Sequence, residues 1–269
     1  MTLYLGRLAN MNDDATPEPA ASGPSSPKKR RVGLWVGIGI ACVVVLGAAA
    51  AWFFFFRSDA PPPVSSESAT SIIAEGGVAQ GGEPGEIDGK WNLDQTIGTI
   101  DDFSSSFAGY RIDEQLASIG ANTAAGRTPD VSGSLDVSGA SVTNVDVTVD
   151  MTTLESDDRR RDGQMRKRGL QTDEFPTATF KAAGPVTLDT KPADGISYSQ
   201  TVAGELTLHG VTKQIEVPVS AQLLSNVIVI TGSFEVALAD YDIEPPTGLS
   251  VVSVADTGEI EFQLFFTHA

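Results

Sequence analysis

The side chains that most often carry catalysis or bind metal ions are scarce in this chain. Its 269 residues include two histidines, His209 and His268, and one cysteine, Cys42. A structural zinc site needs about four ligands, so these side chains do not suffice. The sequence also has no Gly-x-Ser-x-Gly elbow and no P-loop, dinucleotide or calcium-loop pattern. We therefore expect a protein that is not an enzyme and has no metal or cofactor.

The histidines and the acidic pairs have structural interpretations. His209 precedes Gly210 between two alternating segments, which predicts a hydrogen-bonded residue in a tight turn. His268 stands next to the C-terminal residue, where we expect a mobile side chain. Asp101-Asp102 and Asp157-Asp158 are each adjacent in sequence, and a solvated surface accounts for them.

Positive charge is concentrated in residues 159–168. From Arg57 onward, 32 acidic residues face 13 basic ones, a net charge of −19, which argues against nucleic-acid binding. Two interpretations of the basic segment stay open: a solvated helix face, or a cationic rim that meets a lipid headgroup or a membrane surface. Arg161 and Arg166 are the candidates for a headgroup or rim contact. The six basic residues are Arg159, Arg160, Arg161, Arg166, Lys167 and Arg168.

The elements that must position these residues are mainly strands. Apolar and polar residues alternate with a period of two after residue 130, and glycine- or proline-containing turns separate the runs. Short half-polar strands of this kind predict an all-β fold, an antiparallel sandwich or barrel. The clearest runs are 145–150, 205–208, 215–219, 234–238 and 260–264.

Two helices are expected as well. Ser156 is a suitable N-cap, acidic residues follow it, and Gly169 follows a basic last turn, so the sequence predicts a helix over 157–168. Ile112, Leu116 and Ile119 fall at helical spacing, which predicts a second helix over 112–119.

Residues 32–56 contain no charged side chain. At about 1.5 Å per residue they are long enough for a transmembrane helix. Lys28, Lys29, Arg30 and Arg31 precede the segment, which predicts a single-pass cell-membrane protein with a cytoplasmic N-terminus and an extracellular C-terminal domain. A cleaved signal peptide is the alternative, since small residues occupy 48–51. Lipid modification of Cys42 and nuclear import through 27–32 are weaker alternatives.

The remaining chain divides by composition. Residues 1–31 are rich in proline and predict a disordered cytoplasmic tail, and 57–87 predict a flexible linker that lets the outer domain stand off the membrane. Residues 88–269 are long enough for one domain with its own core.

Three segments of this domain resemble the YceI-like family. Arg161-Asp162, Met165-Arg166 and Phe175–Phe180 resemble the family's first signature, Gly204–Lys213 resembles its second, and Trp91–Asp94 resembles its first strand. The resemblance covers about 88–269. Residues 108–128 resemble a variant found in membrane-tethered members from high-GC Gram-positive bacteria.

The resemblance implies a lipocalin-like antiparallel β-barrel that holds a long isoprenoid or similar amphiphile. Gln164-Met165 stands where the family often has His-Leu, and 241–246 departs from an Asn-Arg-x-x-Phe-Gly segment. These departures leave the fold as expected and leave the ligand open. The candidates for the barrel interior and for lipid contact are Phe103, Phe107, Phe180, Leu206, Leu208, Val217, Phe234, Phe262 and Leu264.

Two functions are compatible with these observations. The first is a membrane-tethered carrier that binds, sequesters or transports an isoprenoid, quinone or fatty amphiphile. The second is an adhesion or scaffold module with a barrel filled by its own side chains and an acidic protein-binding surface. A continuous apolar cavity is expected for the first function and not for the second.

Overall fold

The computed structural model describes residues 43–47, 60–76, 86–118, 120–246 and 251–269. The chain divides into two compact units, Met1–Phe54 and Phe55–Ala269. Within the predicted membrane segment 32–56, residues 43–47 are helical and exposed, and the rest lies outside the described residues, as does the predicted tail 1–31. Over the described ranges, no helix has the length and apolar character needed to cross a bilayer.

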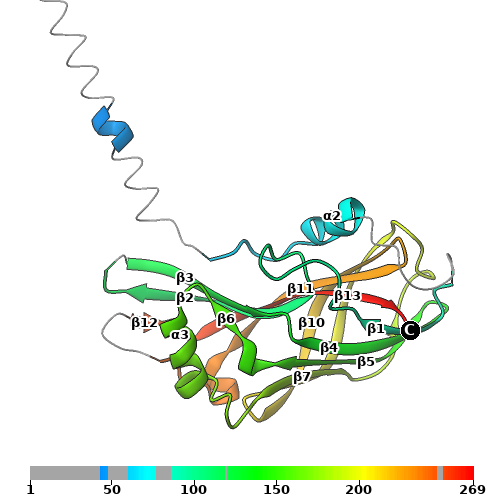
Figure 1. Cartoon of the computed structure of the whole chain (residues 1–269). Helices are drawn as coiled ribbons and strands as arrows, with labels where there is room; N and C mark the ends of the chain where they lie inside the picture. Colours follow the sequence, from blue (N-terminus) through cyan, green and yellow to red (C-terminus); the bar gives the residue numbers. More distant parts are fainter. Residues whose placement is uncertain (1–42, 48–59, 77–85, 119, 247–250) are drawn as a thin grey trace, which may run out of the picture. The chain divides into compact units, whose positions relative to one another are not determined.

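The second unit is an all-β structure with a few short helices (Figure 1). Its helical segments are α2 (Ser66–Gly76), η1 (Met151–Thr153), α3 (Arg159–Gln164), η2 (Met165–Gly169) and η3 (Leu238–Tyr241). Its strands are β1 (Gly89–Leu93), β2 (Phe107–Leu116), β3 (Gly120–Thr128), β4 (Val131–Ser138), β5 (Ser141–Asp150), β6 (Glu155–Ser156), β7 (Thr177–Ala182), β8 (Val186–Thr187), β9 (Ser197–Leu208), β10 (Val211–Leu224), β11 (Val227–Ala237), β12 (Val251–Val254) and β13 (Thr257–His268).

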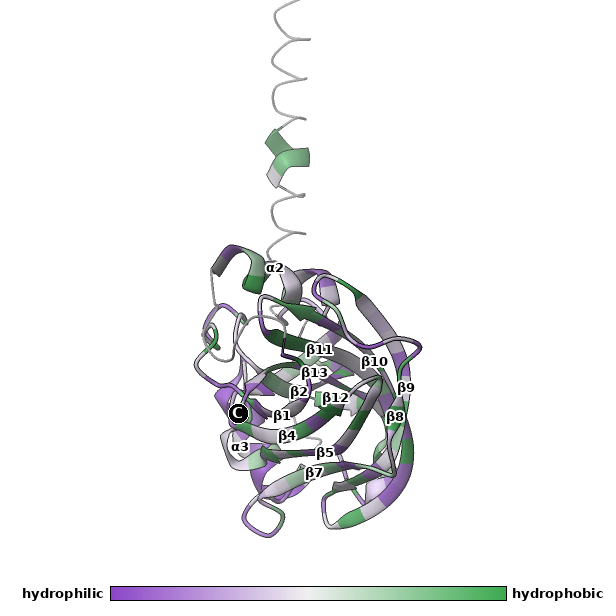
Figure 2. Cartoon of the chain, turned by 90° about the vertical axis from the view of Figure 1, so that its right-hand side faces the viewer, coloured by the Kyte–Doolittle hydropathy of each residue, from purple (hydrophilic) through white to green (hydrophobic). Residues whose placement is uncertain are grey.

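The strands close into an antiparallel barrel. Neighbouring strands pair in the order β1-β4-β5-β7-β9-β10-β11-β13, and the β1–β13 pairing completes a ring of eight among the described strands. Beyond its contact with β1, strand β13 pairs with β2, which continues the sheet through β3 to β6. Figure 2 shows the strands wrapped around a common interior. The predicted alternating runs all lie in these strands, which confirms the antiparallel barrel.

The alternation places one side of each strand inside the barrel. Trp91, Leu135 and Phe266 belong to one buried cluster inside it, and Leu206 and Val236 belong to a second. Because successive side chains of a strand point to opposite faces, the intervening residues lie outside.

One predicted helix is confirmed in shifted form and the other is wrong. The first begins after Asp158, whose side chain accepts from the Arg160 amide, so that Asp158 is the N-cap in place of Ser156. Its last turn widens into the π-helix η2, which ends at Gly169. Residues 112–116 belong to strand β2, where Ile112 and Leu116 share a face because a separation of four residues is even.

The predicted flexible linker is ordered over residues 60–76, which corrects part of that prediction. Residues 60–64 run along the outside of the barrel, and helix α2 packs on β10 and β11. Ala69 and Ile73 are buried there against Val227, Val229 and Phe265. The outer face of β11 and β13 therefore carries a third apolar cluster, covered by α2.

A buried ionic cluster attaches residues 60–64, called the strap below, to the barrel. Glu261 on β13 is fully buried, and its Oε1 lies 2.8 Å from Arg127 Nη2 on β3. Arg127 Nη2 also donates to the Pro62 carbonyl, and Arg111 Nη1 donates to that of Pro61, both at 2.6 Å. The Val64 amide donates to Glu261 Oε2 at 3.2 Å. The strap therefore supplies part of the polar environment that a buried carboxylate needs.

Candidate functional site: the barrel cavity

The barrel encloses a cavity of about 740 Å³. This volume lies in the range of about 300–1,000 Å³ that is usual for small-molecule sites. Most of the wall consists of inward-facing aliphatic and aromatic side chains. Strand β5 provides Val145, Val147 and Val149, strand β10 provides Val217 and Val219, and strand β13 provides Ile260, Phe262 and Leu264.

Seven of the nine predicted interior residues line this cavity. They are Phe180, Leu206, Leu208, Val217, Phe234, Phe262 and Leu264. The placement of Phe103 and Phe107 is corrected. Phe107 has the outward parity of β2, and Phe103 lies in the loop before that strand; their rings pack on the Arg127 guanidinium at 4.2 and 4.7 Å. Both aromatics thus belong to the environment of the Glu261 ionic cluster outside the barrel.

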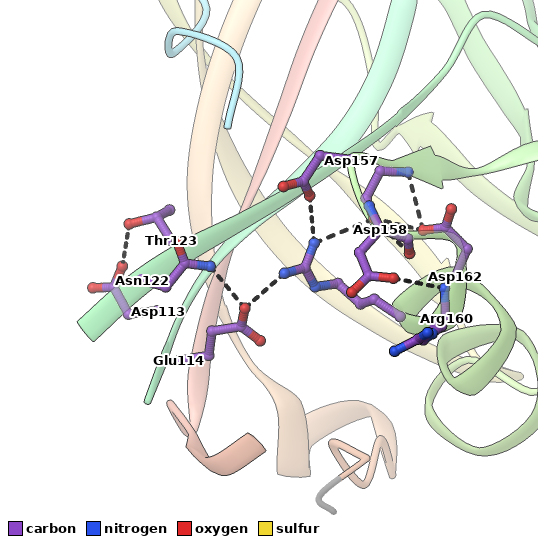
Figure 3. A network of polar contacts seen from close by, with 10 residues as sticks. Asp113, Glu114, Asn122, Thr123, Asp157, Asp158, Arg160 and Asp162 are labelled. Atoms are coloured by element: carbon purple, nitrogen blue, oxygen red, sulfur yellow. Dashed lines mark hydrogen bonds and ion pairs between the residues drawn. The ribbon is translucent and has the colours of Figure 1, made fainter. Parts of the chain in front are cut away.

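One end of the cavity has a polar rim built by β2 and α3 (Figure 3). Glu114 projects from β2 and is buried; its Oε1 accepts from Arg161 Nη2 at 2.7 Å and from Asn122 Nδ2 at 2.8 Å. Arg161 also donates to Asp157. Burial opposes the charge on Arg161, but the two carboxylates outweigh it and raise the pKa of Arg161. The guanidinium therefore remains charged and occupied by protein partners.

Asp162, the partner of Arg161 in the sequence motif, holds the chain that leads into α3. Its Oδ1 accepts from the Ser156 amide at 3.0 Å and from the Ser156 hydroxyl at 2.6 Å. These contacts fix the β6–α3 junction, so that Arg161 reaches across to Glu114. The Arg-Asp pair thus positions the rim.

Arg161 lines the cavity, whereas Arg166 does not. Arg166 donates to the Leu154 carbonyl at 3.4 Å and lies 3.9 Å from Glu155. Arg160 and Arg168, which belong to the basic segment for which a cationic rim was one interpretation, also line the cavity, and so does Glu114, which was not predicted. The basic run itself pointed to the arginines, but Glu114 lies 47 residues from Arg161 and carries no local signal.

A phenol lies in the cavity wall beside this rim. Tyr110 on β2 has the same inward parity as Ile112 and Glu114. Burial raises the pKa of Tyr110 well above its ordinary value, so its hydroxyl stays protonated at neutral pH. The rim thus offers a neutral hydroxyl as well as charged groups to a polar end of a ligand.

The two histidines lie away from the cavity. His209 has φ +51° in the turn before Gly210, which confirms the predicted turn. Its ring nitrogens lie 2.9 Å from the Tyr241 carbonyl and 2.9 Å from Gln171 Oε1, and Phe175 packs edge-on against it. The prediction of a mobile His268 is wrong: its ring packs on Trp91, and its Nε2 lies 3.2 Å from the Asp88 carbonyl.

The lining of the cavity is mainly aliphatic and aromatic. Its described lining includes no histidine, cysteine or lysine. Across the described ranges, no group of three or more His, Cys, Asp and Glu side chains could hold a metal ion. A long apolar wall ending at a polar rim suits an amphiphile, whose tail would lie among the valines and phenylalanines.

These features define a class of protein, the lipocalin-like barrels that enclose an apolar cavity. The YceI-like domain model matches residues 92–266, well over half of the chain. The chain therefore belongs to the YceI-like family.

Solved structures similar to this chain include proteins from three bacteria. A polyisoprenoid binding domain from Saccharophagus degradans, implicated in plant cell wall breakdown, has a TM-score of 0.53 and 20% identity, covering 66% of this chain and 98% of its own. BcnA from Burkholderia cenocepacia has a TM-score of 0.47 and 20% identity, with 64% and 98% covered. The Campylobacter jejuni YCEI protein has a TM-score of 0.42 and 17% identity, with 52% and 82% covered. A search of curated proteins gave no significant match.

Proposed function

We propose that this protein binds a long-chain isoprenoid or a similar amphiphilic lipid in the barrel and sequesters or transports it. The observation that carries the proposal is the 740 Å³ cavity with an apolar wall and a polar rim at one end. Membership of the YceI-like family supports the same ligand class, and the Saccharophagus degradans structure is described as a polyisoprenoid binding domain.

The apolar wall provides the driving force for such a ligand. Each buried methylene contributes about 0.8 kcal/mol relative to water. Ordering a flexible tail offsets part of this gain, and so does the alternative of leaving the tail in a bilayer. Because the barrel is already formed around the cavity, binding requires little ordering of the protein itself, which leaves more of the gain for the ligand.

We place this activity at the outer face of a cell membrane. The proposal rests on the uncharged segment 32–56 and the basic residues before it, which favour a single span with residues 57–269 outside the cytoplasm. The alternative function, a scaffold module, assumes a barrel filled by its own side chains. The cavity favours the lipid carrier.

The test is mass spectrometry of organic extracts from the chain purified without residues 1–56. This form retains the strap, α2 and the whole barrel. A lipid with a long apolar tail, present in stoichiometric amount, is the expected result. A folded chain that carries no lipid and takes up no prenyl or acyl probe would exclude the carrier function.

A pair of substitutions on β10 ties the result to the cavity. Val217 lines the cavity, whereas its neighbour Glu216 is exposed. Val217→Trp fills the interior and is expected to remove the lipid from the extract. Glu216→Trp adds the same ring outside and is expected to leave the lipid in place. Equal lipid content in both variants would place the lipid outside the barrel.

A further inference from the structure

We propose that four basic side chains, Arg159, Arg160, Lys167 and Arg168, dock the rim end of the barrel onto an anionic lipid bilayer. They lie on α3 and η2, and all four are exposed. We call them the cationic patch. This inference rests on the proposed lipid-binding function for its purpose, though not for its test.

The charges of the patch have no intramolecular partners among the described residues. Within the described part of the chain, the other arginines and lysines form ion pairs with carboxylates, with the exception of Lys90. The four residues of the patch have neither an ion pair nor a side-chain hydrogen bond among the described residues. The nearby Asp157 is bound to Arg161, and Asp158 caps α3. The charge of the patch is therefore available to an external anion.

The rest of the chain after residue 56 is strongly acidic, which sets the patch apart from it. The chain from Arg57 onward has a net charge of −19, so an anionic membrane repels most of its surface. Each basic residue near an anionic membrane surface contributes to the attraction, and a flat array of anionic headgroups can contact all four residues at once. The patch therefore selects one orientation, with α3 and η2 toward the lipid.

The patch lies at the end of the barrel where the cavity has its polar rim. Arg160 and Arg168 both belong to the cavity lining. Strand β12 lies at the same end, pairing with the end of β2, and Val251 and Val254 line the cavity (Figure 1). Between them, Val252 is 67% exposed, an apolar side chain at the rim that suits the headgroup boundary. Binding of an acidic protein partner would neutralise the charges of the patch, but it would not account for the apolar cavity beside them.

The test places a fluorescent probe at each end of the barrel in the full chain. Cys42→Ser removes the natural thiol, and Val252→Cys carries a bimane at the rim end. Ile196→Cys is the matched probe at the opposite end, where Ile196 is 50% exposed. The chain is mixed with phosphatidylcholine vesicles containing a brominated lipid, with or without phosphatidylglycerol. Docking is expected to quench the Val252→Cys probe severalfold more strongly with phosphatidylglycerol, while the Ile196→Cys probe changes little.

Charge variants tie the quenching to the patch. Replacing all four patch residues by glutamine is expected to reduce quenching to the level in phosphatidylcholine alone. The matched control replaces Lys90, Lys181, Lys191 and Lys213 by glutamine, which removes the same charge elsewhere and is expected to retain the quenching. The proposal would be overturned by quenching that does not depend on phosphatidylglycerol, that is unchanged when the four patch residues are replaced, or that is equal at both probes.

Docking and lipid binding are separable in this design. Val217→Trp fills the cavity without altering the patch, so the quenching should persist in that variant. If extraction finds no lipid while the quenching holds, the carrier function fails and the docking surface stands. If lipid is present but the quenching is absent, the docking surface fails alone.

Discussion

At the scale of single residues, Glu261 is the buried charge that depends most on its partners. Its carboxylate is fully buried on the outer face of β13 and pairs with Arg127. Burial lowers the pKa of Arg127, but Glu261 opposes that effect. A buried charge that loses its partner destabilises a protein strongly, because its desolvation is no longer compensated.

Glu261→Gln is therefore expected to reduce the free energy of unfolding by about 3–5 kcal/mol. Urea titration followed by tryptophan fluorescence measures the change. Glu235→Gln is the control, since Glu235 is exposed on the neighbouring strand β11 and its loss should cost less than about 0.5 kcal/mol. Equal stability of the two variants would contradict the structural role of the ionic cluster.

At the scale of elements, the period-two strands were predictable and the elements that cover them were not. The predicted runs carry their alternation within four to six residues. Helix α2 has only a few apolar residues in a serine-rich segment, and its partner surface, which includes Val229 and Phe265, forms only when β11 and β13 pair. For the same reason, the alternating run 260–264 gives no sign that Glu261 is buried on the outer face.

The contribution of α2 is measurable at Ile73, which is buried against the outer face of the barrel. Ile73→Ala is expected to destabilise the protein by about 2–5 kcal/mol through lost burial and the cavity left behind. Ile72→Ala, at a half-buried position of the same helix, should cost less. Thermal unfolding of both variants tests this difference; a Tm unchanged by Ile73→Ala would mean that α2 does not stabilise the barrel.

The walls of the candidate site were largely predictable, and of its rim only the arginines were. Most of the seven interior residues lie in the alternating runs, whereas Phe107 begins strand β2, which was not predicted as a strand, so its outward parity could not be recognised. The Glu114–Arg161 contact joins elements that are distant in sequence, and no spacing rule connects them.

At the scale of the whole molecule, ligand binding and stability are linked. A ligand that binds only the folded barrel stabilises it by about 2.7 kcal/mol at a concentration of a hundred times its Kd. Geranylgeraniol is therefore expected to raise the Tm of lipid-free protein in a concentration-dependent manner. Val217→Trp should abolish the increase and Glu216→Trp should retain it; an equal increase in both would indicate binding outside the cavity.

The attachment of the strap changes how far the barrel can travel. A free chain from Phe56 to Asp88, at about 3.5 Å per residue, would extend to about 110 Å. With Pro61 held by Arg111, the slack that remains after Phe56 is only about 18 Å. If residues 32–56 are embedded in a membrane, this short tether confines the barrel to the thin layer of solvent next to the headgroups. The two arginine–carbonyl contacts set this limit, and their loss would extend the free chain only as far as α2, which begins at Ser66 and packs on the barrel, to about 35 Å.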